Sequence, residues 1–162
     1  MVSNTKEQAL ESAIEKRLTG TSLEERQAVL KNQSEKNSIA DSKQAHYRGG
    51  NGYYLGQPAD YNAQYAIDET HFWQFLQATQ KEELEKLQRR SCSKNDWKLK
   101  ILERFDRMIK KYGILHLLKK GLDVDDAHFI LFYQLPLASS SPSVKDNFAK
   151  NRFSETRQLR YS

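Results

Sequence analysis

Four basic residues of this 162-residue chain recur at helical spacing. They follow one another at i, i+4, i+7 and i+11, so a helix would carry them as one stripe: Lys100, Arg104, Arg107 and Lys111. Residues 81–120 around them hold 13 Lys/Arg against 6 Asp/Glu, a local charge of +7 in a chain of net charge +5. Because neutralised phosphates release condensed counterions, this pattern favours a polyanion as ligand, and a solvated helix surface is the alternative.

Other residue types that carry chemistry form no site pattern. Residues 46–67 are rich in glycine and tyrosine, but the chain has no Gly-Lys-Ser/Thr and no strand is expected before this loop, which argues against a P-loop. The four histidines lack metal-ligand spacing, and Cys92 has no cysteine partner, so neither a zinc site nor a disulfide is expected. No G-x-S-x-G occurs to mark a serine nucleophile.

Composition limits the class of protein. The length is that of about one domain, and 38% apolar residues is lean against the usual ~45–50%. The lean composition indicates a long solvated segment or a piece of something larger. No apolar run reaches the ~18–20 residues of a membrane span, and the N-terminus lacks a signal-peptide core. With a single cysteine, we expect a soluble cytoplasmic protein without a membrane partner.

The basic stripe needs a helix from about Asn95 to Tyr112, whose buried face is its neighbouring apolar stripe: Trp97, Ile101, Phe105, Met108 and Tyr112. An earlier helix is predicted over residues 5–18, ending at Gly20. Its core face would consist of Leu10, Ala13, Ile14 and Leu18. Glu7, Glu11 and Glu15 would lie on the opposite face.

Further signals place the remaining elements. Capping boxes are predicted at residues 22–25 and 79–82, and Asp68 is expected to cap another helix. Residues 31–44 are almost wholly polar, so we expect a flexible polar insertion within residues 21–45. The apolar run 129–133 predicts a strand covered on both faces, residues 141–150 a short helix, and residues 152–162 a final strand.

The assembled pattern resembles the N-terminal region of the restriction (R) subunit of type I restriction enzymes. The resemblance lies in ALESAIEKRLTG, GGNGYYLGQPADYNAQYAIDETHFWQFLQATQ, DWKLKILERFDRMIKKYGILHLLKKGLDVDDAHFILFYQLPLASSS and NFAKNRFSETRQLRYS. These stretches span nearly the whole chain in the family's order, apart from residues 21–45. No single short motif carries the match.

The resemblance implies an α-rich α/β fold, the helical N-terminal part of a PD-(D/E)xK-like endonuclease domain, over residues 1–162. The family's R subunit cleaves unmodified double-stranded DNA after ATP-dependent translocation. It uses Mg²⁺ and ATP, and it assembles with methyltransferase (M) and specificity (S) subunits. Its catalytic Asp and Glu-x-Lys follow the segment matching TRQLRYS, so we expect a chain truncated before the catalytic strands. Because the ATPase motifs are absent too, we expect it to be inactive alone and to bind no cofactor.

The resemblance also implies site residues. Nucleases of this superfamily often place a first-helix carboxylate near the metal, and the Leu-Glu-x-x-Ile pattern assigns that role to Glu11, against the alternative of a solvated acidic face. Arg157 and Arg160 would join the basic stripe in phosphate contact. Two other interpretations stay open: a helical DNA-binding or subunit-docking module without catalysis, and a structural piece whose stripe is solvated.

Overall fold

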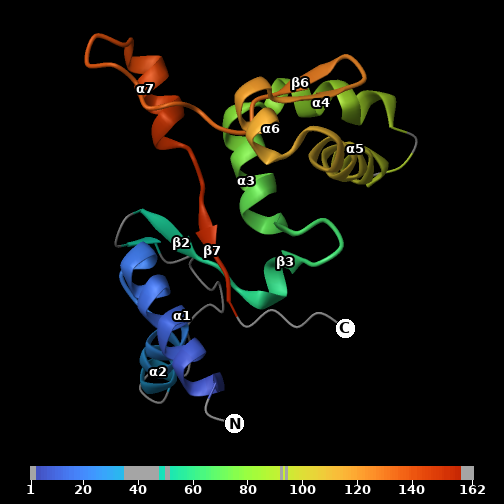
Figure 1. Ribbon diagram of the computed structural model, residues 1–162. Helices are drawn as coiled ribbons and strands as arrows, with labels where there is room; N and C mark the ends of the chain where they lie inside the picture. The colour runs from blue at the N-terminus through green and yellow to red at the C-terminus, as the bar shows by residue number, and fades with distance from the viewer. Residues whose placement is uncertain (1–2, 35–47, 50–51, 92, 94, 158–162) are drawn as a thin grey trace. The chain divides into compact units, whose positions relative to one another are not determined.

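The computed structural model describes residues 3–34, 48–49, 52–91, 93 and 95–157 (Figure 1). In this part of the chain, groups of helices are separated by groups of short strands, so the fold is α-rich α/β, as the sequence predicts. The chain divides into two compact units. Unit 1 comprises Met1–Tyr61 and Arg152–Ser162, and unit 2 comprises Asn62–Asn151. None of the helices described is long and apolar enough to cross a bilayer.

Two helices open unit 1. Helix α1 (Ser3–Thr19) ends at Gly20, whose φ of +83° is a conformation that glycine adopts without steric cost. Helix α2 (Leu23–Ser34) begins with the predicted capping box. The Ser22 hydroxyl accepts from the Glu25 N–H and the Glu25 carboxylate accepts from the Ser22 N–H, each at 3.3 Å. Thus α2 occupies part of the predicted insertion at 21–45, and residues 35–45 of it lie outside the described residues.

A three-stranded sheet completes unit 1. Strand β2 (Tyr53–Leu55) pairs antiparallel with β1 (Arg48–Gly49) and parallel with β7 (Ser154–Glu155), in register Tyr54↔Ser154, and a 3₁₀ turn (Pro58–Asp60) follows β2. Helix α1 lies against β2 and β7. The final strand predicted over 152–162 is described only as β7, because residues 158–162 lie outside the described part.

Unit 2 places four helices around one apolar core. Strands β3 (Tyr61–Asn62) and β4 (Ile67–Asp68) pair before α3 (Glu69–Thr79), which Asp68 caps by accepting from the His71 N–H at 3.1 Å. Helices α4 (Lys81–Arg90), α5 (Asp96–Tyr112) and α6 (Ile114–Lys120) follow. The second predicted capping box is wrong. Gln80 begins α4 without a side-chain cap, because the Thr79 hydroxyl bonds back to the Phe75 carbonyl at 2.8 Å.

A hairpin of β5 (Leu122–Val124) and β6 (Ala127–Phe129) closes this core. Its inward side chains are buried and the residues between them are exposed, as alternation in a strand requires: Leu122, Val124, Ala127 and Phe129. Gly121, at φ +77°, joins α6 to the hairpin, and a Cβ there would lie 2.6 Å from the Phe129 carbonyl oxygen. The last helix, α7 (Pro142–Ala149), starts after Ser141, as predicted.

The strand predicted over 129–133 is wrong in extent. Strand β6 ends at Phe129, because its partner β5 begins at Leu122, opposite Phe129. Beyond Phe129, side-chain carboxamides form the backbone hydrogen bonds that a strand partner would otherwise form. Gln80 accepts from the Ile130 N–H at 2.6 Å and donates to its carbonyl at 2.8 Å. The Asn151 carboxamide does the same for Tyr133, at 3.0 and 2.7 Å.

Candidate functional site

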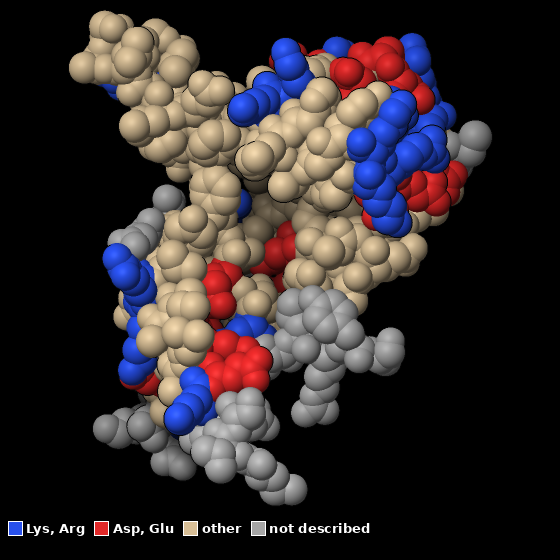
Figure 2. Space-filling view, viewed as in Figure 1, with Lys and Arg blue, Asp and Glu red and all other residues tan. Residues whose placement is uncertain are grey.

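Helix α5 carries the predicted basic stripe, and its apolar face packs into the core. Trp97, Ile101 and Phe105 are at most 7% exposed, which confirms this part of the predicted apolar face. The predicted burial of Tyr112 is wrong: it is 48% exposed, because it ends α5 and stacks on His116 outside the core. The four cations therefore project from a helix that the core holds in place: Lys100, Arg104, Arg107 and Lys111. Figure 2 shows Lys and Arg gathered over α5, with acidic groups beside them. The stripe is thus a mixed-charge surface.

The β5–β6 hairpin holds the N-terminal half of this stripe. Lys100 Nζ lies 2.5 Å from the Asp125 carboxylate, and Arg104 Nε donates to the Asp123 carbonyl at 3.1 Å. On the α4 side, Arg90 pairs with Asp126 at 3.0 Å. Asp125 occupies the hairpin turn at φ +53°. The acidic turn, defined here as Asp123–Asp126, therefore connects to both α4 and α5.

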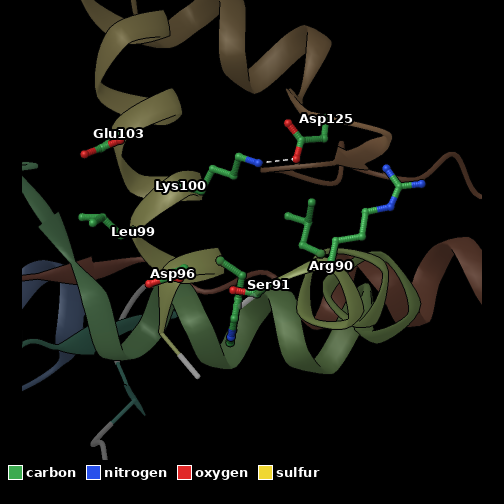
Figure 3. A pocket seen from close by; sticks show the side chains of 9 residues that line it. Arg90, Ser91, Asp96, Leu99, Lys100, Glu103 and Asp125 are labelled. Atoms are coloured by element: carbon green, nitrogen blue, oxygen red, sulfur yellow. Dashed lines mark hydrogen bonds and ion pairs between the residues drawn. The ribbon is translucent and has the colours of Figure 1, made fainter. Parts of the chain in front are cut away.

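A hollow of about 360 Å³ lies where these elements meet (Figure 3). Leu87 and Trp97 give it apolar surface, and its basic groups are Arg90 and Lys100. Both of these cations are already paired with the acidic turn. The hollow therefore offers an incoming anion no cation that lacks a carboxylate partner.

The C-terminal half of the stripe borders a different hollow, of about 620 Å³. Arg107, Lys110 and Lys111 line it from α5, and Gln64 and Tyr65 line it from the turn between β3 and β4. Lys110 pairs with Asp106 on its own helix at 2.7 Å, and the Lys111 ammonium lies 4.8 Å from the Tyr112 ring centroid. Arg107 forms no ion pair with any residue that the structure describes.

The first helix of unit 1 is turned relative to the prediction. Leu10 is 62% exposed and Ile14 47%, whereas Glu15 is 1% exposed. The Glu15 carboxylate accepts from Arg157 Nε at 2.8 Å and from the Leu23 N–H at 3.1 Å. The predicted core face Leu10/Ile14 and the solvated position of Glu15 are thus wrong. The reason is that the partners of Glu15 come from α2 and from Arg157, which follows β7, and α1 alone does not reveal them.

Arg157 is buried together with Glu15, to which it donates a hydrogen bond. It is 7% exposed and also pairs with Glu24. The two carboxylates outweigh the effect of burial and raise the pKa of Arg157, so the guanidinium is charged. Its position gives no support to the predicted phosphate contact, while Arg160 lies outside the described residues.

Carboxylates crowd the same region. Burial raises the pKa of Glu15, although the Leu23 N–H and Arg157 oppose the shift. Burial also raises the pKa of Glu155, reinforced by the charges of Glu15 and Glu11, and its Oε2 is buried without a hydrogen-bond partner among the described residues. The role that the resemblance implies for Glu11 gains only this charge effect on Glu155.

These acids do not fit a magnesium site. In the part of the chain that the structure describes, no group of three or more His, Cys, Asp or Glu side chains is arranged to hold a metal ion. Glu15 Oε2 is occupied by its two donors, and Arg157 brings a cation into the place that a metal would take. No chemistry that depends on a metal follows from this cluster.

Two of the described histidines serve local structure. His71 Nδ1 lies 2.9 Å from Asp68 at the start of α3, and His128 Nδ1 lies 2.6 Å from Asp123 across the hairpin. Cys92 lies outside the described residues. The acidic turn and Glu155 are the groups that sequence reasoning missed. Three aspartates within Asp123–Asp126, directly after a basic segment, were the available signal for the turn.

No family model, curated protein or solved structure matched the chain.

Proposed function

We propose that the chain is the N-terminal region of the restriction subunit of a type I restriction enzyme and that α5 contacts DNA phosphates without reading sequence. The observation that carries the DNA contact is the basic stripe on a buried helix, within a segment of charge +7. The resemblance of the four quoted stretches supports the family. Cleavage of unmodified DNA, ATP-driven translocation and assembly with methyltransferase and specificity subunits belong to this proposal for the whole subunit.

The physical reason for phosphate contact is preorganisation. Because Trp97, Ile101 and Phe105 anchor α5, binding DNA needs to order only the basic side chains, not the helix. Lys and Arg contacts to phosphates position a protein on DNA but carry no sequence information. In type I enzymes the specificity subunit would supply the sequence recognition that this surface lacks.

The test is the affinity for two unrelated 20-base-pair duplexes, measured by fluorescence anisotropy at several salt concentrations. We expect equal affinities that fall linearly with log salt, with a slope of roughly 0.9 per phosphate contact. Replacing Lys100, Arg104, Arg107 and Lys111 by Gln should reduce the slope. A matched control removes four cations of α4, namely Lys81, Lys86, Arg89 and Arg90. If the slope falls as much in this control as in the stripe variant, DNA contact through α5 is refuted.

The chain should not cleave DNA. It contains neither a Glu-x-Lys nor a Gly-Lys-Ser/Thr, the residues that supply metal binding and ATP binding in the proposed family. Incubation with Mg²⁺, ATP and supercoiled plasmid should leave the plasmid intact. Nicking that a Glu11→Ala variant loses would contradict this expectation and would restore a metal-site role to Glu11.

Subunit docking is a second candidate, which one observation favours. Leu10 and Ile14 form an exposed apolar stripe on α1, and such stripes are typical of protein interfaces. Mixing the chain with methyltransferase and specificity subunits in sedimentation velocity should give a complex that Leu10→Asp abolishes. Ile130→Asp, at another exposed apolar residue, is the control. No complex, or equal losses for both variants, would exclude docking through α1.

A further inference from the structure

The charge lining α5 changes sign along the helix. Three hollows follow it from its N-terminal to its C-terminal end. The first is lined by two cations and three carboxylates, the second by three of each, and the third by three cations and two carboxylates. The net charge of the lining side chains is therefore −1 in the first hollow, zero in the second and +1 in the third. A uniform stripe in the sequence is thus a graded surface in the folded chain.

The acidic turn produces this gradient. Asp125 neutralises Lys100, and the Asp123 carbonyl takes the Nε–H of Arg104, so each of these side chains already has an oxygen partner. A phosphate approaching there would have to displace these partners and would meet two carboxylates of the turn, Asp123 and Asp125. The turn places anions where a phosphate would otherwise bind.

We infer that DNA phosphates contact only the C-terminal half of α5, through Arg107 and Lys111, and that the acidic turn excludes them from the N-terminal half. The inference rests on the proposed DNA binding and assigns its residues. Arg107 forms no ion pair among the described residues, and Lys111 contacts only an aromatic ring there. Lys110 adds a positive charge to this half of the helix, but it forms an ion pair with Asp106.

The opposite wall of this hollow is fixed in position. Asn62 Oδ1 accepts from the backbone N–H groups of Gln64 and Tyr65, at 3.1 and 3.4 Å, which holds the turn. The Gln64 amide, which donates to the Tyr65 hydroxyl at 3.3 Å, borders the same hollow as Arg107. We assign Gln64 as a neutral donor to a phosphate that Arg107 binds.

The experiment compares two double variants that remove the same charge from the same helix. Arg107→Gln with Lys111→Gln should reduce the slope of log affinity against log salt by about 1.8, or roughly 0.9 per contact. Lys100→Gln with Arg104→Gln should leave the slope unchanged. Circular dichroism and tryptophan fluorescence check that both variants are folded.

The outcomes separate this inference from the proposed function. If the two double variants lose equal slope, or if only the Lys100/Arg104 variant loses slope, the inference is overturned while DNA binding by α5 stands. If neither variant changes the slope, the proposed function fails as well. Loss of the Arg107/Lys111 contribution alone supports both.

Two single variants keep the test decisive if the Lys100/Arg104 variant does not fold. Asp125→Asn frees Lys100 from its carboxylate, so the slope should rise toward one additional contact, by about 0.9. An unchanged slope would refute exclusion by the turn. Gln64→Ala should weaken binding about 3- to 10-fold at unchanged slope, because a neutral hydrogen bond releases no counterion. Unaltered affinity would remove Gln64 from the site.

Discussion

The buried pair of Glu15 and Arg157 allows a quantitative prediction for unit 1. Their side chains are 1% and 5% exposed, so water does not screen the interaction. Removing one partner of such a pair typically costs about 3–5 kcal/mol. Glu24 still pairs with Arg157 after Glu15→Leu, so we expect the lower end, about 3 kcal/mol.

The double variant sharpens this prediction. Glu15→Leu with Arg157→Met removes both charges and fills the space with apolar groups, which is often nearly neutral for buried pairs. The Leu23 N–H, however, loses its acceptor, which costs about 1 kcal/mol. The double variant should therefore be more stable than Glu15→Leu by about 2 kcal/mol.

Hydrogen exchange read by mass spectrometry measures both quantities. For Glu15→Leu, peptides from α1 should exchange about 100-fold faster, since about 1.4 kcal/mol corresponds to a factor of ten. Peptides from α5, which belong to unit 2, serve as the internal reference. The reasoning is refuted if α1 exchange changes less than about tenfold, or if the double variant exchanges as fast as the single one.

Three further predictions concern other contacts. Gln80→Ala should speed exchange of the Ile130 amide about fivefold, because a hydrogen bond worth about 1 kcal/mol is lost. Unchanged exchange would contradict the carboxamide contact. Burial raises the pKa of Glu155, so its ionisation destabilises the fold as pH rises above 4.5. Glu155→Gln should therefore raise the unfolding free energy at pH 7. In urea titrations, the unfolding free energy of this variant should fall less with rising pH than that of the unchanged protein. Gly121→Ala should lower the melting temperature more than Gly113→Ala does, because the added Cβ would meet a backbone oxygen at 2.6 Å at Gly121 and nothing within 4 Å at Gly113. Equal losses would attribute the effect to φ alone.

Local signals in the sequence were sufficient for part of the fold. Helix α5 follows from its apolar period, and the capping box of Ser22 and Glu25 formed as expected because both partners lie within four residues. The helix end at Gly20 likewise depends only on local backbone geometry. Such features need no knowledge of the rest of the chain.

Features that depend on distant partners were missed. Glu15 is buried by a residue 142 positions away, so the periodicity of α1 indicated the wrong face. The Gln80 carboxamide, 50 positions from Ile130, takes the place of a strand partner, which an apolar run cannot reveal. The pairing of Lys100 with the turn is of the same kind, so the stripe was predictable while its division into two halves was not.

The nested arrangement of the two units has a consequence for folding during synthesis. Unit 1 is assembled from segments that come before and after unit 2, and β7 is the last of them described. Unit 2 is contiguous, so its core can form as soon as Asn151 has emerged from the ribosome. At that stage β2 has no parallel neighbour and Glu15 has no guanidinium partner. On a nascent chain, α1 therefore cannot complete its contacts until residues 152–157 have been synthesised, and Glu15 can stay hydrated until Arg157 is available.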